Sequence, residues 1–142
     1  MAGRRIVAGV DGSPSSIKAL RWAIRQAKLT GAEVEAVTAW SYPSGYGFAP
    51  PGEGSSDFEG VAGKILFEAL AEVSGIAPDV VVEPLVVYGH AADVLVRAAE
   101  GADLLVVGSR GHGGFAGMLL GSVSQHCVHH APCPVLILRD GR

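Results

Sequence analysis

The densest glycine segment of the sequence carries its clearest chemical signal. Glycine makes up 20 of the 142 residues, about twice its average share. Six of these 20 lie between Gly108 and Gly121. Without a Cβ, glycine lets main-chain N–H groups approach a polyanion. A helix starting at Gly121-Ser122 would add free N–H donors and the positive end of its dipole. The Ser122 hydroxyl and Arg110 could also contact an anion, so the segment predicts a phosphate-binding loop.

A surface loop without a ligand is the alternative interpretation. Ser122 and Gln125 have the spacing of a capping box, so Ser122 could simply cap a helix. Two other phosphate motifs are disfavoured. No Gly-x-x-x-x-Gly-Lys-Ser/Thr occurs, which excludes a P-loop NTPase. Gly111-x-Gly113-x-x-Ala116 matches the dinucleotide fingerprint formally, but it follows a late strand, and no acidic strand end follows at a suitable distance.

Asp11 is the only carboxylate expected beside this loop. It could contact a ribose or position Mg²⁺ indirectly, or it could be a turn aspartate bonded to its own backbone. Hydrolysis would need a group that activates water, and the sequence offers no convincing second carboxylate or glutamine nearby. His112 could act as a base, but an exposed loop histidine is the commoner case. The site therefore predicts binding, with no catalytic residue assigned.

A second cluster of reactive side chains lies near the C-terminal end. His126 and His130 are four residues apart on an expected helix, a spacing compatible with metal ligation. Cys127 falls on the apolar stripe of that helix, which favours a core position, and histidines suit a last helical turn for electrostatic reasons. We therefore expect no metal site. Cys127 and Cys133 are too few for a secreted disulfide scaffold, and we expect no bond between them.

Alternating strands and helices would position these residues. Apolar runs predict strands at 6–10, 34–39, 80–88, 104–107 and 135–138. Helical spacing predicts a helix from Pro14, capped by Ser13 and stopped by Gly31. The remaining helices are expected from a Ser56–Glu59 capping box to Gly75, at 91–99 and at 121–130. The glycine- and proline-rich segment 41–56 predicts a long, mobile loop.

This alternation predicts an α/β fold with a mainly parallel sheet covered by helices on both faces. Pro84 cannot donate a ladder hydrogen bond, which places its strand at a sheet edge. Ligands of such folds bind beyond the carboxyl ends of the strands, at the topological switch point. The loops after the first and fourth strands are therefore the expected site.

Composition limits the class of protein. A length of 142 residues predicts one domain over 1–142. A hydrophobic fraction of 49% with 18% charged residues excludes a disordered chain. The net charge of −3 disfavours nucleic acid and anionic membranes as partners. The run at 6–10 is too short for a signal peptide, and no apolar run reaches the roughly 20 residues of a membrane span. We expect a soluble cytoplasmic protein.

Three blocks in order resemble the universal stress protein family, and together they cover essentially the whole chain. They are Gly9-Val10-Asp11-Gly12-Ser13, Asp103-Leu104-Leu105-Val106-Val107-Gly108-Ser109-Arg110-Gly111, and His130-Ala131-Pro132-Cys133-Pro134-Val135. The spacing Gly108-x-x-Gly111-(nine residues)-Gly121-Ser122 resembles the family's nucleotide-binding motif. The resemblance implies a doubly wound domain with strand order 3-2-1-4-5. It also implies ATP as the cofactor, since the family members that bind ATP carry the full glycine motif. Ala91 departs from the family, which often has proline there.

The resemblance also implies roles for particular residues. Asp11 would bond the ribose or adenine region, Ala39 would offer its backbone to the adenine edge, and the dimer would form through Val135–Leu138. The full set of expected nucleotide-binding residues is Gly9, Val10, Asp11, Ala39, Gly108, Ser109, Arg110, Gly111, His112, Gly113, Gly114, Gly121, Ser122 and Val123. The function implied is an ATP-binding stress-response and regulatory module, with at most weak ATPase activity. A slow hydrolase, a nucleotidyl transferase and a non-nucleotide interaction module are the alternatives.

Overall fold

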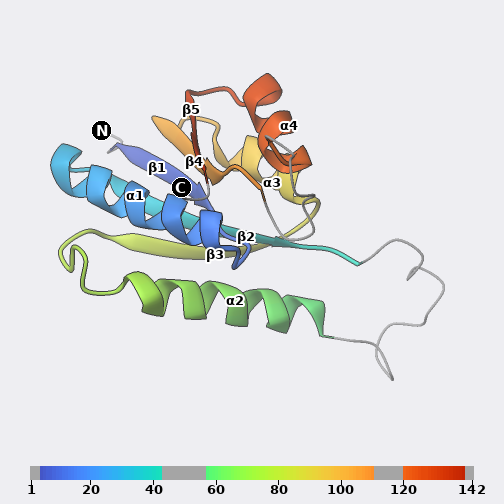
Figure 1. The fold of residues 1–142 in the computed structure, drawn as a ribbon, viewed down its shortest axis with the longest axis horizontal. Helices are drawn as coiled ribbons and strands as arrows, with labels where there is room; N and C mark the ends of the chain where they lie inside the picture. Colours follow the sequence, from blue (N-terminus) through green and yellow to red (C-terminus); the bar gives the residue numbers. More distant parts are fainter. Residues whose placement is uncertain (1–3, 43–56, 111–119, 140–142) are drawn as a thin grey trace.

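The computed structural model describes residues 4–42, 57–110 and 120–139. Five strands form one parallel sheet in the order β3-β2-β1-β4-β5 (Figure 1). This confirms the predicted α/β class and strand order. The strands are β1 Arg5–Gly9, β2 Glu33–Trp40, β3 Val82–Tyr88, β4 Leu104–Gly108 and β5 Val135–Leu138. The expected loop at 41–56 falls almost entirely outside the described residues.

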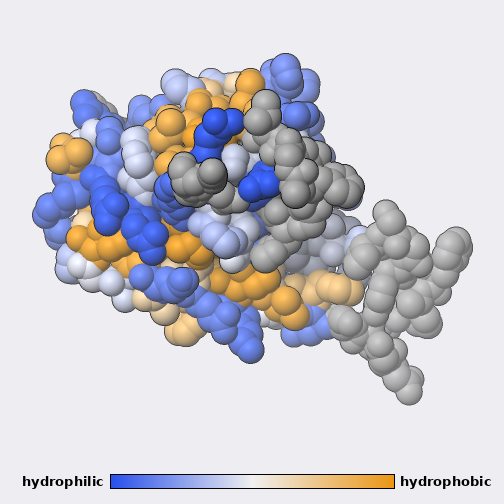
Figure 2. Space-filling view, in the orientation of Figure 1, coloured by the Kyte–Doolittle hydropathy of each residue, from blue (hydrophilic) through white to orange (hydrophobic). Residues whose placement is uncertain are grey.

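The helices form a layer on each face of the sheet. Helices α1 Pro14–Thr30 and α2 Phe58–Val73 cover one face, and α3 Ala91–Ala98 and α4 Ser122–His130 cover the other (Figure 1). Two buried clusters correspond to the two layers. One packs Leu20 and Leu66 against β1 and β2, and the other packs Leu95 and Cys127 against β4. Figure 2 shows hydrophobic surface between α1 and α2, next to hydrophilic residues.

Helix α1 begins and ends as its sequence predicts. The Ser13 hydroxyl accepts a hydrogen bond from the Ser16 N–H, and Pro14 takes the first helical position. Gly31 ends the helix with φ of 80°, a left-handed conformation that disfavours residues with a side chain. This start matters for function because it fixes the turn that follows β1.

Helix α2 is capped differently from the prediction. Asp57, rather than Ser56, is the N-cap residue, and its Oδ1 accepts from the Gly60 N–H at 2.9 Å. Because the helix begins at Phe58, the expected Ser56–Glu59 box is one residue out of register. A carboxylate also interacts favourably with the helix dipole. The C-cap is Ser74, and Gly75 follows it at φ of 91°.

The edge position predicted for the third strand is confirmed, although β3 starts two residues later than expected. The Val34 N–H bonds the Val81 carbonyl, so the backbone groups of alternate residues in β3 point away from β2. Pro84 is one of these outward residues, and its missing N–H removes no ladder bond. Within the described ranges, no helix combines the length and apolarity needed to cross a membrane.

Candidate nucleotide site

The site expected from the sequence lies at the carboxyl edge of the two central strands. β1 pairs with β4 in register from Ile6 to Ala8, so the segments after both strands leave the sheet side by side. The chain then turns to α1 on one face and to α4 on the other (Figure 1). This divergence is the topological switch point, where parallel α/β sheets bind ligands.

Asp11 is held in a tight turn at this edge. Its Oδ1 accepts from the Ser13 N–H at 2.9 Å and from the Ser13 hydroxyl at 2.5 Å, while its own N–H donates to Ser16 Oγ at 3.2 Å. The turn interpretation of this aspartate is therefore seen in the structure. Both bonds use the same oxygen, and no described residue donates to Oδ2 through a hydrogen bond in the structure. The turn thus orients the carboxylate without using all of it.

The glycines at the ends of β1 and β4 have packing reasons of their own. A Cβ on Gly108 would lie 2.8 Å from the backbone carbonyl carbon of Ser15, in the first turn of α1. A Cβ on Gly9 would lie 2.8 Å from Leu95 Cδ1 on α3. At Gly108 the neighbour is backbone, so packing alone accounts for glycine there, whether or not a ligand binds. At Gly9 the neighbour is the flexible end of the Leu95 side chain, which could shift.

The segment after β4 is tied back to the body of the domain at both of its ends. At its start, the Arg110 carbonyl accepts from Ser15 Oγ at 2.7 Å. At its other end, the Gly121 N–H donates to the Ser109 carbonyl at 2.6 Å, and Ser124 Oγ lies 3.0 Å from the same carbonyl. Gly111, His112, Gly113 and Gly114, expected in this segment, lie outside the described residues.

Helix α4 begins without a side-chain cap. Gly121 is the N-cap residue, no side chain of a described residue accepts from the N–H groups of the first turn, and Ser122 is the exposed first residue of the helix. The capping interpretation of Ser122 is therefore wrong, because the cap position falls one residue earlier. The opening N–H groups of an α-helix have no acceptor within the helix. An exposed hydroxyl, partly buried Val123 and this positive helix end suit an anion.

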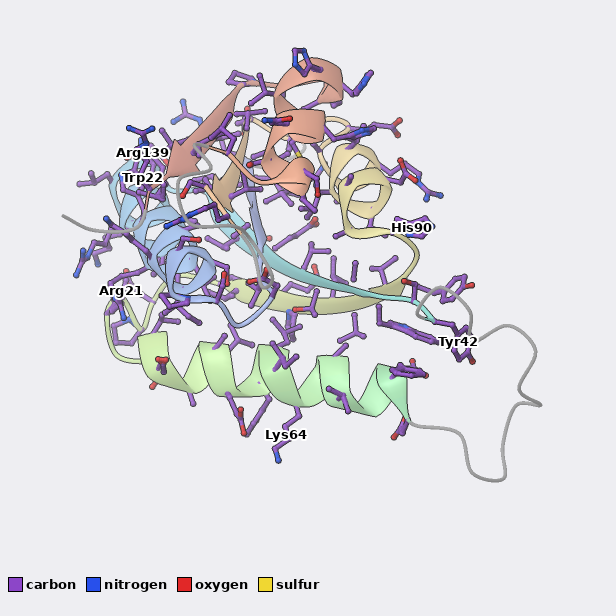
Figure 3. The ribbon with its side chains drawn as sticks, turned by 45° about the vertical axis from the view of Figure 1, so that its right-hand side comes forward. Arg21, Trp22, Tyr42, Lys64, His90 and Arg139 are labelled. Atoms are coloured by element: carbon purple, nitrogen blue, oxygen red, sulfur yellow. The ribbon has the colours of Figure 1, made fainter. Side chains whose placement is uncertain are left out.

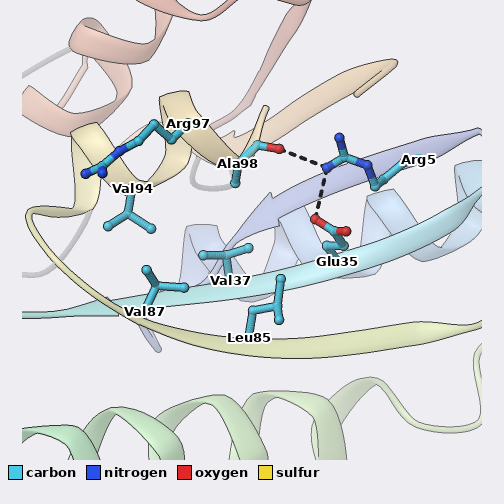
Figure 4. Close-up of a pocket in the computed structure, with 8 residues that line it drawn as sticks. All are labelled: Arg5, Glu35, Val37, Leu85, Val87, Val94, Arg97 and Ala98. Carbon is cyan, nitrogen blue, oxygen red and sulfur yellow. Dashed lines mark hydrogen bonds and ion pairs between the residues drawn. The ribbon is translucent and has the colours of Figure 1, made fainter. Parts of the chain in front are cut away.

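A pocket of about 450 Å³ lies on the α3 face of the sheet, and none of the expected nucleotide-binding residues lines it (Figure 4). Ala39 lies on the same face of β2 as Val37, and it pairs with Val87 of β3. Val37 and Val87 both line the pocket, whose far end is closed by an ion pair of 3.0 Å between Arg5 and Glu35. Valine, leucine and alanine side chains make up most of the lining, and Arg97 on α3 adds a third charged group.

An aromatic cluster at the same end of the sheet was missed by the sequence analysis. Trp40 packs edge-on against Tyr88 with ring centroids 4.9 Å apart, and Tyr42 packs edge-on against Phe58 at 5.7 Å. Figure 3 shows Tyr42 at the end of β2, at the same end of the molecule as His90. Parallel strands that both end in aromatic residues were the available signal, because their carboxyl ends meet at one edge.

The histidine and cysteine cluster does not converge on a metal-binding arrangement. Cys127 is fully buried in the core, as its place on the apolar stripe predicts, and both cysteines are free thiols. Burial raises the pKa of the Cys127 thiol to about 11, with a contribution from Cys133. His126 lies 3.7 Å from Asp93 and stacks on His130. Among the described residues, no three potential ligands gather to hold a metal ion.

Comparison with known proteins places this architecture in a family. The sequence profile of the Universal stress protein family matches residues 3–139, which is nearly the whole chain. The chain therefore belongs to the universal stress protein family, as the resemblance in its sequence implied.

Individual relatives refine this assignment. The chain is 41% identical to universal stress protein Rv2005c of Mycobacterium tuberculosis over 135 residues, 95% of this chain and 45% of that protein. It thus spans less than half the length of the curated relative. A crystal structure of a universal stress protein in complex with cAMP is 32% identical, with a TM-score of 0.71 and 98% of each chain covered. The universal stress protein from Archaeoglobus fulgidus in complex with dAMP shares the fold at 23% identity, with a TM-score of 0.71 over 97% of this chain and 99% of that one.

Proposed function

We propose that this protein binds an adenine nucleotide, ATP in particular, at the carboxyl edge of β1, β2 and β4. In this proposal, nucleotide occupancy makes it a regulatory module of the stress response. The observation that carries the proposal is the start of α4. It is a helix N-terminus that no side chain of the described residues caps, and it is joined to the end of β4 through the Ser109 carbonyl. Backbone donors at such a position hold phosphate without many lysines.

The proposed residue roles follow the order of the strands across the sheet. The opening N–H groups of α4, the Ser122 hydroxyl and the glycine segment from Gly108 would take the phosphates. Asp11 would accept a ribose hydroxyl on Oδ2, since Ser13 occupies Oδ1. The adenine would lie by Ala39, whose neighbourhood on the sheet is apolar. Mg²⁺ would enter only with the phosphates, with Asp11 as the nearby carboxylate.

The solved relatives support a nucleotide rather than another anion. One was crystallised with cAMP and another with dAMP, and both ligands join adenine to one phosphate. ATP adds two phosphates, and the glycine segment is the part of this chain suited to them. The low content of charged residues is compatible with binding through backbone N–H groups.

The direct test is to identify and titrate the ligand. Protein purified without added nucleotide would be denatured and its released small molecules identified by mass spectrometry. Calorimetry on the stripped protein would then compare ATP, ADP, AMP and cAMP. We expect one nucleotide per chain with ATP among the ligands, and stabilisation of about 2.7 kcal/mol at a hundredfold excess over Kd. Absence of any adenine-nucleotide binding would contradict the proposal.

The same preparation separates binding from catalysis. As a binding module, the protein should release little phosphate over many hours at saturating ATP. Multiple-turnover phosphate release that disappears in Asp11→Asn or His112→Ala would instead favour the hydrolase alternative. A protein that binds no nucleotide would favour an interaction module.

We also propose that two copies pair through β5. The Leu105 N–H bonds the Pro134 carbonyl and the Ser109 N–H bonds the Leu138 carbonyl. The backbone groups of Val135 and Ile137 therefore point away from β4, because alternate residues of a strand face opposite sides. All four β5 side chains are only partly buried. An apolar edge of this kind favours pairing with another strand.

A further inference from the structure

Two buried serines that no motif singled out hold the ends of the proposed phosphate loop. Ser15 is 1% exposed and Ser124 is 2% exposed. Neither lies in the glycine segment, and neither belongs to the residues expected to touch a nucleotide. Buried hydroxyls are costly unless they are bonded, so their partners indicate what they do.

Ser15 fixes the point where the chain leaves β4. Its Oγ donates to the Arg110 carbonyl at 2.7 Å, linking residues that are 95 positions apart in the sequence. Ser15 also packs against Gly108 so closely that a Cβ there would collide with it. The first turn of α1 therefore sets both the position and the direction of the chain as the glycine segment begins.

Ser124 fixes the point where the chain returns. Its Oγ lies 3.0 Å from the Ser109 carbonyl and 3.0 Å from the Gly121 carbonyl. The Gly121 N–H donates to the same Ser109 carbonyl at 2.6 Å. One carbonyl at the end of β4 thus holds the N-cap residue and the first turn of α4. This contact sets the direction in which the opening N–H groups of that helix point.

We propose that Ser15 and Ser124 are positioning residues for the polyphosphate part of a bound nucleotide. This inference rests on the proposed function. They fix the chain just after β4 and the first turn of α4 before any ligand binds. Binding therefore does not have to order these two ends of the loop. Preorganisation of this kind increases affinity without any contact to the ligand. The phosphates benefit from it, whereas the nucleoside lies over β1 and β2.

The test compares ATP with adenosine, the same ligand without phosphates. Calorimetry on Ser15→Ala and Ser124→Ala would give Kd for ATP, and competition against ATP would give Kd for adenosine. We expect ATP to bind about tenfold more weakly to each variant, and adenosine to bind within about twofold of wild type. Ser124→Thr, which keeps the hydroxyl, should recover most of the ATP affinity.

Two control variants separate positioning from general destabilisation. Val73→Ala removes buried side-chain volume from the α2 end of the core, away from this loop. Thr38→Val removes a buried hydroxyl that has no hydrogen-bond partner among the described residues. Both should keep the wild-type ratio of ATP affinity to adenosine affinity. All titrations would be run at a temperature where each variant is folded, as checked by circular dichroism.

The outcomes are distinct. If wild type binds neither ligand, the proposed function fails and this inference fails with it. If wild type binds ATP but both serine variants bind it equally well, only this inference fails. Equal loss of ATP and adenosine affinity would also overturn it, because the effect would then be general. If Ser15→Ala does not fold, Ser124→Ala and its threonine counterpart decide the question by the same ratio.

Discussion

At the residue scale, Asp11 combines a structural bond with the chemistry expected of a ligand contact. Its Oδ1 receives the Ser13 N–H and hydroxyl, and Ser13 in turn caps α1. A turn aspartate and a nucleotide-binding aspartate are therefore compatible functions of one side chain. The alternatives drawn from the sequence do not exclude each other, because a carboxylate has two oxygens and several lone pairs.

Replacing Asp11 with alanine should affect both functions. We expect ATP affinity to fall at least tenfold, and the free energy of unfolding to fall by about 1 kcal/mol because Ser13 loses its acceptor. Calorimetry and urea denaturation would measure the two effects. Asp79→Asn makes the same change of formal charge at an exposed carboxylate whose pKa is lowered by Lys28. Nucleotide affinity should be unchanged in that variant; an equal loss there would point to net charge instead.

Cys127 makes a prediction about alkaline pH. Its pKa rises from 9.0 to about 11 on folding, chiefly through burial. The raised pKa means that this thiol contributes stability below pH 9, which is lost as the pH rises through about 11. The loss is at most about 2 to 3 kcal/mol. Urea denaturation between pH 8 and pH 11 should show a shallower decline for Cys127→Ala than for wild type. Parallel curves would contradict this assignment.

At the element scale, the contact between α1 and the end of β4 matters more than either element alone. Gly108 allows the first turn of α1 to approach, and Ser15 then bonds the chain beyond it. The glycine motif predicts a phosphate-binding role for Gly108, and the structure adds a second reason for glycine at that position. A glycine in such a motif can therefore be required by close helix packing as well as by the approach of a ligand.

Gly108→Ala should therefore destabilise the protein even without ligand. The added Cβ would meet the Ser15 backbone, and overpacking of this kind costs about 1 to 3 kcal/mol. Gly63→Ala is the matched control, since Gly63 lies within α2 and a Cβ there has no atom within 4 Å. Alanine should stabilise that helix by about 0.5 to 1 kcal/mol. Urea denaturation of both variants would test the pair, and equal effects would contradict the packing argument.

At the scale of the whole molecule, the two edge strands of the sheet differ in their proline and charged residues. β3 carries Pro84 with its backbone nitrogen outward, and it presents Glu83 to solvent. β5 has neither proline nor charge among its four residues, Val135 to Leu138. Proline and charge on an edge discourage pairing, and their absence permits it. The β5 edge therefore suits the proposed pairing of two copies better than the β3 edge does.

Ile137→Pro should shift the proposed dimer to monomer. Proline removes an N–H that faces away from β4, so the pairing of β5 with β4 keeps its own hydrogen bonds. Sedimentation equilibrium would measure the change. Ile137→Ala removes the side chain but keeps the N–H, and it should remain dimeric. A wild-type protein that is monomeric at high concentration would contradict the proposed interface.

The sequence by itself determined the succession of elements and the α/β class, and it predicts the edge at which we propose that a nucleotide binds. These depend on local signals: apolar runs, the Ser13-Pro14 start of α1, the Gly31 stop and the proline in β3. Their effects act within a few residues, so they can be recognised without coordinates. The family resemblance implied the strand order, and the spaced glycines carry the proposal of phosphate binding.

Only the tertiary structure decided which residues lie in contact at that edge. Ser15 and Arg110 are 95 positions apart and share no motif, and the cap of α4 proved to be Gly121 rather than Ser122. The aromatic cluster of Trp40 and Tyr88 likewise forms only when β2 and β3 pair. Such contacts depend on how close the packed elements approach one another. That distance is set by the core as a whole, and no local stretch of sequence encodes it.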